Sequence, residues 1–225
     1  MTTTGQAAGL TLLVLAKAPV PGRVKTRLAA DLRGGHDAAA IVAAAALLDT
    51  IDACVATVGA TSCRLALEGD LRGAVRGAEI RDALSGWTVV PQRGRGLGER
   101  LARAHADVTG PVLQVGMDTP QLTADLLHRT AAGLASSDAV LAPAADGGWW
   151  ALALRTGRVA AVLRDVEMST PHTYRDTRTA LLGAGLSVGV GEVLTDVDRL
   201  EDLVAVAEQA PWSRCALTAP WEAVA

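Results

Sequence analysis

The stretch LTLLVLAKAPVPGRVKTRL, residues 10–28, decides the fold class of this 225-residue chain. Its apolar run over 10–16 predicts a buried strand, which ends at a loop broken by proline and glycine at 19–22. Arg23, Lys25 and Arg27 follow, and a helix-like segment begins there. A strand that leads through a glycine loop into a helix is where α/β proteins bind phosphate groups, because backbone N–H groups and the helix N-terminus attract anions. We therefore expect a nucleotide or another phosphorylated ligand at this loop, and the alternative is a polar turn with solvated charges.

Two better-known phosphate-binding loops do not match this chain. A Walker A loop needs glycines where Pro19 and Val24 stand, although Lys25-Thr26 would suit it. A Rossmann fingerprint should directly follow the first strand, but the nearest match covers 94–98 and has Glu99 in place of the last glycine. The sequence therefore argues against both a P-loop ATPase and a Rossmann dinucleotide-binding protein.

Composition narrows the class of protein. A length of 225 residues favours one domain, with a core over 10–205 and a cap over 206–225. A net charge of −3 argues against non-specific nucleic-acid binding, and three scattered cysteines suit a reducing cytosol. The apolar run 38–48 is too short to cross a bilayer, and residues 1–9 lack the basic start of a signal peptide. We expect a cytoplasmic protein with no membrane or nucleic-acid partner, and the Ala-rich helix surface is compatible with a homodimer.

Apolar segments rich in Val and Leu alternate with helical segments along the chain. The predicted strands cover 10–16, 62–67, 88–91, 111–116, 138–142, 149–154 and 186–190. The predicted helices cover 25–32, 37–57, 97–108, 123–135, 157–163, 170–183 and 199–209. This alternation predicts an α/β fold with three layers, in which a mostly parallel sheet has helices on both faces.

Ligands bind beyond the carboxyl ends of the strands in such a sheet, so polar residues that follow strands are candidates. Gln92 follows the third predicted strand and could read the edge of a base. Asp118 follows the fourth, where a carboxylate can hold Mg²⁺ or Mn²⁺ against nucleotide phosphates. Asp146 lies in an Asp-Gly-Gly turn before two tryptophans. Each has a structural alternative: a flexible turn at 92–98, an Asp turn before a helix capped by Thr123, and a hairpin turn at 146–148.

Five motifs occur in an order that resembles a known family. They are AKAPVPGRVKTRL (16–28), LGERL (97–101), GMDTP (116–120), PAADGGWW (143–150) and TDVDRLEDL (195–203). Together they are similar to the bacterial glycosyltransferase-like family often labelled arsenosugar-biosynthesis glycosyltransferase, and more distantly to the guanylyltransferases of cofactor assembly. Met117, Thr119 and the Trp149-Trp150 pair depart from residues common in that family, whereas Asp118 and the Asp-Gly-Gly turn are retained.

The resemblance implies the GT-A-like fold of nucleotide-diphospho-sugar transferases and a set of site residues. Lys25, Arg27 and Asp146 would be catalytic, and Asp118 and Asp198 would hold Mg²⁺ or Mn²⁺. Gly147, Gly148 and Trp149 would bind the acceptor. The nucleotide would be bound by Ala16, Pro21, Gly22, Arg23, Lys25, Arg27, Gln92, Gly94, Gly98 and Glu99.

Three functions remain open from the sequence. The first is a metal-dependent glycosyltransferase with a nucleotide-diphospho-sugar donor and a small-molecule acceptor. The second is a guanylyltransferase-like nucleotidyltransferase, which would release pyrophosphate from a nucleoside triphosphate. The third is a nucleotide-binding regulator without turnover. Retention of the polar residues in all five motifs favours an enzyme.

Overall fold

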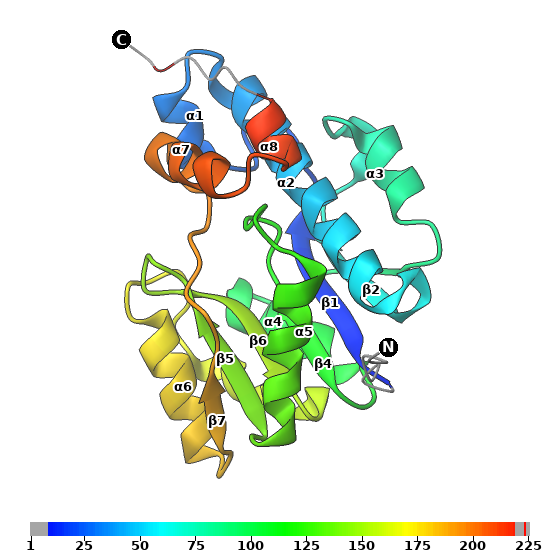
Figure 1. Ribbon diagram of the computed structural model, residues 1–225, viewed down its shortest axis with the longest axis vertical. Helices are drawn as coiled ribbons and strands as arrows, with labels where there is room; N and C mark the ends of the chain where they lie inside the picture. Colours follow the sequence, from blue (N-terminus) through cyan, green and yellow to red (C-terminus); the bar gives the residue numbers. More distant parts are fainter. Residues whose placement is uncertain (1–8, 219–222, 224–225) are drawn as a thin grey trace, which may run out of the picture.

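The computed structural model describes residues 9–218 and residue 223, and its centre is one seven-stranded sheet (Figure 1). The strands lie in the order β3-β2-β1-β4-β6-β5-β7, and β6 is antiparallel to both of its neighbours while the other pairs are parallel. Their bounds are β1 Thr11–Lys17, β2 Cys63–Glu68, β3 Thr88–Pro91, β4 Val112–Val115, β5 Ala139–Pro143, β6 Trp149–Leu154 and β7 Val188–Val190. The predicted mostly parallel α/β sheet is therefore confirmed.

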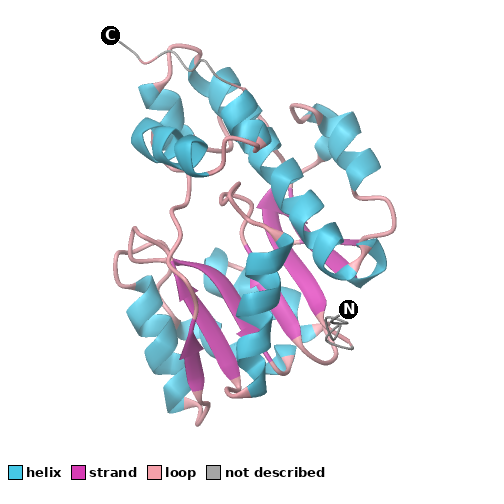
Figure 2. Ribbon diagram, in the orientation of Figure 1, coloured by secondary structure: helices cyan, strands magenta, loops and turns pink. Residues whose placement is uncertain are grey.

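Helices cover both faces of this sheet (Figure 2). They are α1 Thr26–Asp31, α2 Gly35–Val58, α3 Gly77–Ala83, α4 Gly96–Ala106, α5 Ala124–Ala132, α6 Thr173–Gly183, α7 Leu200–Gln209 and α8 Arg214–Leu217. Short 3₁₀ turns are η1 Ala60–Ser62, η2 Leu71–Gly73, η3 Gly133–Ala135 and the longer η4 Gly157–Asp165. Side chains of α2, α3 and α5 share one core with the sheet, and those of α4, η4 and α6 share the other.

The alternation of side chains along β1 builds both cores at once. Leu12 and Val14 belong to the core beneath α2, whereas Leu13 and Leu15 belong to the core beneath α4. Successive side chains of a strand point to opposite faces, so a strand covered on both faces is apolar throughout. The unbroken apolar run that predicted β1 is the sequence signature of this double burial.

Helix α2 is long and apolar enough to cross a membrane by length and composition, which corrects the expectation that its apolar run is too short. However, 72% of its apolar window is buried inside the protein. One side of α2 packs on the sheet, and the other contributes to a third core with α1, α7 and α8 (Figure 1). A helix that is buried on two sides is apolar all round, so its packing accounts for its composition.

The predicted bounds of most strands and helices lie close to the observed ones, and the differences have local causes. β3 and β6 have the predicted bounds, but the expected helix at 157–163 is the 3₁₀ segment η4. Helix α3 was not predicted, because it is short and begins after Arg76 in the left-handed conformation (φ 53°) instead of at a capping side chain. The single domain and the cap over 206–225 stay predictions, and residues 1–8, 219–222 and 224–225 lie outside the described chain.

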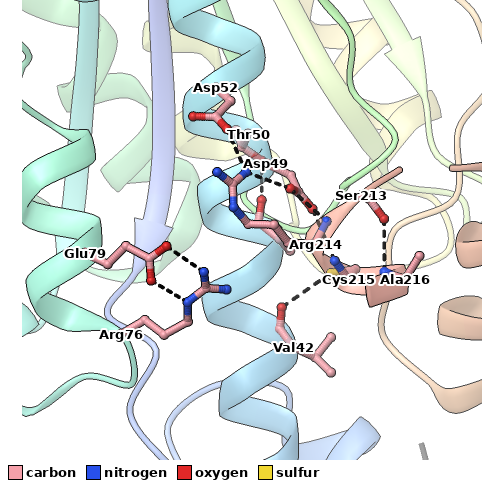
Figure 3. Close-up of polar contacts among 11 residues, drawn as sticks. Val42, Asp49, Thr50, Asp52, Arg76, Glu79, Ser213, Arg214, Cys215 and Ala216 are labelled. Atoms are coloured by element: carbon pink, nitrogen blue, oxygen red, sulfur yellow. Dashed lines mark hydrogen bonds and ion pairs between the residues drawn. The ribbon is translucent and has the colours of Figure 1, made fainter. Parts of the chain in front are cut away.

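A buried carboxylate joins α8 to α2. Asp49 accepts hydrogen bonds from the backbone N–H groups of Arg214 (3.1 Å) and Cys215 (3.4 Å) and from the Arg214 guanidinium (3.1 Å), as Figure 3 shows. Arg214 also pairs with Asp52 at 2.7 Å. The first turn of α8 is thus fastened to the middle of α2 by a charged acceptor that satisfies its N–H groups.

We predict that Asp49→Ala lowers the free energy of unfolding by about 2 kcal/mol, because it leaves these partly buried donors without their charged acceptor. Thermal and urea unfolding measure this loss. Arg76→Ala is the control, since it breaks the exposed Arg76–Glu79 pair, also drawn in Figure 3, and such pairs contribute about 0–1 kcal/mol. Equal losses in the two variants would contradict the role of Asp49.

Candidate functional site

The loop after β1 places Lys25 at the start of α1. Gly22 has a φ of +76°, a conformation that glycine adopts without strain, and the Arg23 N–H donates back to the Val20 carbonyl across this turn. Lys25 itself is left-handed (φ 47°, ψ 44°), and its carbonyl accepts a hydrogen bond from Ala29 in α1. A non-glycine residue in this conformation is uncommon and is held by its surroundings. For Lys25 these surroundings are acidic.

The Lys25 ammonium lies between two carboxylates from distant segments. Its Nζ is 2.8 Å from Asp118 Oδ1, at the end of β4, and 2.9 Å from Asp198 Oδ1, after β7. The Lys25 side chain is only 6% exposed, whereas those of Asp118 and Asp198 are 37% and 42% exposed. Arg27 approaches the other oxygen of Asp198 at 3.6 Å. The predicted phosphate-binding lysine is therefore already paired with both predicted metal ligands.

These contacts change the pKa values of the groups involved. Burial by itself would lower the pKa of Lys25, but the Asp118 and Asp198 carboxylates outweigh it and raise that pKa above its usual value. Burial would raise the pKa of Asp198, yet Lys25, with smaller contributions from Arg27 and Arg199, lowers it. Lys25 and Asp198 are therefore both charged throughout the neutral range.

Asp196 adds a third carboxylate from the segment that follows β7. Its Oδ1 accepts a hydrogen bond from the Thr119 hydroxyl at 2.9 Å, and the neighbouring Val197 N–H donates to the Asp118 carbonyl. Burial and the Asp118 charge raise the pKa of Asp196 to about 7, although Thr119 and Lys25 oppose this rise. These two hydrogen bonds join the segment after β7 to the segment after β4. The carboxylates of Asp118, Asp196 and Asp198 therefore lie close together.

A cleft of about 480 Å³ opens at this edge of the sheet. The predicted site residues that line it are Ala16, Arg23, Lys25, Gln92, Asp118, Asp146, Gly148 and Trp149. The predicted site residues that do not line it are Pro21, Gly22, Arg27, Gly94, Gly98, Glu99, Gly147 and Asp198. Residues from four separate segments, at or after β1, β3, β4 and β5, therefore meet at one cavity.

Two of the glycines outside the cleft pack against backbone. A Cβ on Gly98 would lie 2.2 Å from the Leu163 carbonyl oxygen, and one on Gly147 would lie 2.2 Å from that of Pro171. Glycine permits the close approach of α4 to η4 and of the β5–β6 hairpin to the segment before α6. The Asp146 carboxylate accepts a hydrogen bond from Gly148 N–H, so the hairpin turn and the position in the cleft are both present.

Two polar side chains of the segment 92–99, which follows β3, also have internal partners. The Gln92 amide donates to the carbonyls of Ala16 (2.9 Å) and Ala66 (3.0 Å), so it bridges β1 and β2. The Glu99 carboxylate accepts from Arg95 N–H and from the Arg103 guanidinium. Gln92 lines the cleft, but its amide N–H groups already donate to the protein's own carbonyls. Glu99 accepts a hydrogen bond from the backbone N–H of Arg95, the residue before α4.

Sequence reasoning missed other residues that line the cleft. Asp196 belongs to a quoted motif, but Asp198 was selected there as the metal ligand. Gln114 is the polar residue within the otherwise apolar strand β4, and that interruption was the available signal. Residues 168–170 and Thr173, from the segment that leads into α6, also line the cleft and carried no recognisable pattern.

The Asp118 carboxylate suits a hard divalent cation. Asp118 lines the cleft with part of its carboxylate exposed, and Mg²⁺ commonly takes one or two protein carboxylates and fills its shell with phosphate oxygens and water. Asp196 lies on the same cleft, whereas both oxygens of Asp198 face cations. Over residues 9–218, no group of three or more His, Cys, Asp or Glu side chains is placed to hold a metal by itself.

We predict that Lys25→Met destabilises the protein by about 1–3 kcal/mol, since it leaves carboxylates close together without their shared cation; the value is below that for a fully buried pair because the acids are partly exposed. The raised pKa of Lys25 and the lowered pKa of Asp198 give the pH window. The difference between wild type and variant should be complete from just above neutral pH to the unfolded lysine value of 10.5, and part of it should be lost near pH 7, because Lys25 also lowers the pKa of Asp196, which is about 7 in the wild type. It should shrink as the pH falls through the folded pKa of Asp198. Urea unfolding from about pH 3 to 9 measures it, and a difference that does not change at low pH would contradict this account.

Comparison with known proteins shows the family and the fold of this chain. The model of the family described as "Uncharacterized protein conserved in bacteria (DUF2064)" matches residues 50–170. No curated protein sequence matches the chain. A solved structure from Desulfovibrio desulfuricans G20, described as a candidate nucleotide-diphospho-sugar transferase, is similar with a TM-score of 0.74 and 26% identity, over 90% of this chain and 87% of that one.

More distant structures share the fold. A CMP:2-keto-3-deoxy-manno-octonic acid synthetase complexed with CTP has a TM-score of 0.58 at 12% identity, over 91% of this chain and 99% of its own. A cytidylyltransferase from Leptospira borgpetersenii has a TM-score of 0.58 at 10% identity, over 93% and 92%. The chain thus has the nucleotide-diphospho-sugar transferase fold and belongs to the bacterial family DUF2064.

Proposed function

We propose that this protein is a nucleotide-dependent transferase, and specifically a glycosyltransferase that uses a nucleotide-diphospho-sugar donor and a small-molecule acceptor. The observation that supports it is one cleft that combines cations and carboxylates at the carboxyl ends of β1 and β4. The similarity to the Desulfovibrio structure, which is described as such a transferase, points the same way. A diphosphate suits the cationic loop, and an attached sugar suits the remaining cleft.

Arg23 is the residue that we assign to the donor's phosphates. It lines the cleft, it is exposed, and its side chain makes no hydrogen bond or ion pair with the described residues. Lys25 contributes positive charge, but its ammonium is held by Asp118 and Asp198. Arg23 therefore offers the guanidinium that is free to form charge-assisted hydrogen bonds with phosphate oxygens.

Asp118 is the residue that would hold Mg²⁺ or Mn²⁺, with Asp196 beside it on the cleft; Asp198, the other predicted ligand, lies outside the cleft with its two oxygens at Lys25 and Arg27. A bound divalent cation would supply neutralising charge to the diphosphate. The protein's own contribution is to position the donor and to stabilise the negative charge that develops on the leaving nucleoside diphosphate. Arg23 and Lys25 contribute positive charge from the wall of the cleft, whereas Arg27 lies outside it and faces Asp198.

The transfer itself needs an acceptor hydroxyl and a base. The acceptor oxygen forms a bond to the anomeric carbon of the sugar, and the bond from that carbon to the diphosphate oxygen breaks. The nucleoside diphosphate leaves with the electron pair, and a carboxylate takes the acceptor's proton. Asp146 is our candidate for this base, because it lines the cleft from the β5–β6 hairpin, near enough to Asp196 for its charge to act on that carboxyl.

The same cleft could instead serve nucleotidyl transfer, and the solved synthetase that holds CTP shows that this fold accommodates a nucleoside triphosphate. In that reaction the acceptor oxygen would attack the α-phosphorus, and pyrophosphate would leave. Release of pyrophosphate therefore separates the two functions. Nucleotide binding without any product would indicate the regulator.

A thermal-shift screen tests the proposal. We expect one nucleoside diphospho-sugar, among UDP-, GDP-, ADP-, dTDP- and CDP-sugars, to raise the melting temperature by roughly 5–10 °C at about 100 times its Kd, and to do so only with Mg²⁺ or Mn²⁺. Asp118→Asn should lose the part of this rise in melting temperature that depends on the metal. Asp198→Asn is the matched variant, because Asp198 also pairs with Lys25 but does not line the cleft. It should retain the metal-dependent rise in melting temperature. A metal-dependent shift that survives in Asp118→Asn would contradict the assignment of Asp118.

We predict that Arg23→Ala weakens binding of the preferred nucleoside diphosphate by about 10- to 100-fold, since one charge-assisted hydrogen bond contributes roughly 1.5–3 kcal/mol. Calorimetric titration measures the change. Arg81→Ala removes an exposed arginine from α3, away from the cleft, and should leave the affinity unchanged. Unaltered binding in Arg23→Ala would show that the phosphates lie elsewhere.

A further inference from the structure

Ser169 is a strained residue on the wall of the cleft that the proposed chemistry does not use. Its φ is 63°, in the left-handed region, and it lines the cleft. Of the described non-glycine residues, only Lys25, Arg76 and Ser169 have a positive φ, and Arg76 does not line the cleft. A residue with a side chain is unfavourable in this conformation and keeps it only where its surroundings hold it, which is common at functional sites.

Threonine hydroxyl groups fix the turn that contains Ser169. The Thr173 hydroxyl donates to the Glu167 carbonyl at 3.2 Å and accepts from the Thr170 N–H at 3.0 Å. The Thr170 hydroxyl accepts from the His172 N–H at 3.2 Å. Ser169 is exposed, and its own hydroxyl has no partner among the described residues. The two threonine hydroxyls are therefore used within the turn, whereas the Ser169 hydroxyl is available to a ligand.

This turn packs directly on the β5–β6 hairpin, which carries Asp146. The Tyr174 N–H donates to the Gly147 carbonyl at 2.9 Å, and a Cβ on Gly147 would lie 2.2 Å from the Pro171 carbonyl oxygen. The absence of a side chain at Gly147 lets the turn and the hairpin meet. Asp146 and Ser169 consequently line the same end of the cleft.

The opposite end of the cleft has polar groups that bind one another. The order of strands places the end of β3 on one side of β1 and β4, and the β5–β6 hairpin on the other. On the β3 side, the Gln92 amide donates to carbonyls of β1 and β2, and Arg100 and Lys17 both pair with Glu68. The polar side chains at this end therefore have partners within the protein, in contrast to the Ser169 hydroxyl at the hairpin end.

The hairpin end combines free polar groups with an aromatic side chain. In the described chain, only one oxygen of the Asp146 carboxylate accepts a hydrogen bond, and the Ser169 hydroxyl is unpaired. Trp149 is half-buried there, and its Nε1 donates to the Thr177 hydroxyl at 3.1 Å, which fixes the indole ring. A sugar ring suits such a wall, because its hydroxyl groups bind carboxylate and hydroxyl oxygens while its C–H faces pack on an aromatic ring.

We infer that Ser169 is a specificity-determining residue, whose hydroxyl binds a hydroxyl group of the sugar that the nucleotide donor carries. This inference rests on the proposed function, and it adds a residue that reads the transferred sugar. With the diphosphate at the ends of β1 and β4, the sugar extends toward the hairpin and the base toward β2 and β3. Asp146, the candidate base, lies at the same end, so the acceptor meets the sugar there. The left-handed backbone of Ser169 belongs to the turn conformation that leaves a free hydroxyl on the cleft wall.

Calorimetric titration of wild type, Ser169→Ala and Ser169→Gly tests the inference. The probes are UDP, GDP, ADP, dTDP and CDP and their glucose, mannose or N-acetylglucosamine derivatives, each with Mg²⁺. We expect wild type to bind one nucleotide sugar more tightly than the matching diphosphate. Both variants should bind that nucleotide sugar about 3- to 10-fold more weakly and the diphosphate with unchanged affinity, because one hydrogen bond between neutral groups is lost.

The two variants separate the hydroxyl group from the backbone conformation. Alanine loses the hydroxyl and keeps the left-handed strain, whereas glycine loses the hydroxyl and relieves the strain, so Ser169→Gly should have the higher melting temperature of the two. A loss of sugar affinity in only one of them would assign the effect to the backbone and overturn the inference.

Ser85→Ala is the matched control. Ser85 is also exposed, and its hydroxyl also lacks a partner among the described residues, but it does not line the cleft. This variant should leave the affinities for the nucleotide sugar and for the diphosphate unchanged.

The other outcomes separate the inference from the proposed function. An equal loss for diphosphate and nucleotide sugar would assign Ser169 to the nucleotide and overturn the inference. Wild-type affinities for both ligands in the two Ser169 variants would show that the hydroxyl does not bind the donor, and would also overturn it. So would a wild-type protein that binds a diphosphate but gains nothing from any attached sugar, while the nucleotide site would stand. Failure to bind any nucleotide would contradict the proposed function itself.

Discussion

The cleft depends on the buried Lys25 ammonium and the two carboxylates that it joins. Lys25 comes from the loop after β1, Asp118 from the end of β4 and Asp198 from the segment after β7, so one cation holds three distant parts of the chain at the same edge of the sheet. Without a counter-ion, Asp118, Asp196 and Asp198 would repel one another in a partly buried place. Lys25 makes this concentration of acids possible by neutralising two of them. Its left-handed backbone is part of the loop conformation that places the ammonium between them.

The three cations of the first motif have different roles in the structure. The sequence presents Arg23, Lys25 and Arg27 as equivalent cations after a strand. In the structure Lys25 is internal, Arg27 faces Asp198, and Arg23 lines the cleft without a partner among the described residues. Two of the three cations therefore neutralise the protein's own acids, and one is available to a ligand. A count of charges along the motif does not distinguish these roles, since the partners lie roughly 90 to 170 residues away in the chain.

The fold supports the cleft by two different uses of small residues. Alanines let α2 pack closely against the sheet on one side and against α1, α7 and α8 on the other, which makes a helix that is apolar all round. Gly98 and Gly147 let backbone approach backbone, at η4 and before α6, where any side chain would collide with a carbonyl oxygen. Both glycines belong to motifs that suggested contact with a ligand. Their packing brings Leu97, Trp149 and Thr173 to the wall of the cleft.

The sequence by itself determined the seven strands and most of the helices, the α/β class and the edge of the sheet where the cleft lies. Double burial leaves an unbroken apolar run, as in β1, and the carboxyl ends of parallel strands meet at one edge, so these features are local in the sequence. Only the tertiary structure decided which polar residues have partners: that Lys25 is paired, that the Gln92 amide bridges two strands, and that the Gln114 amide oxygen is buried with no hydrogen-bond partner among the described residues. Pairing between side chains depends on distances of a few ångströms between segments far apart in the chain. No local pattern records those distances, because they arise only when the helices pack on the sheet.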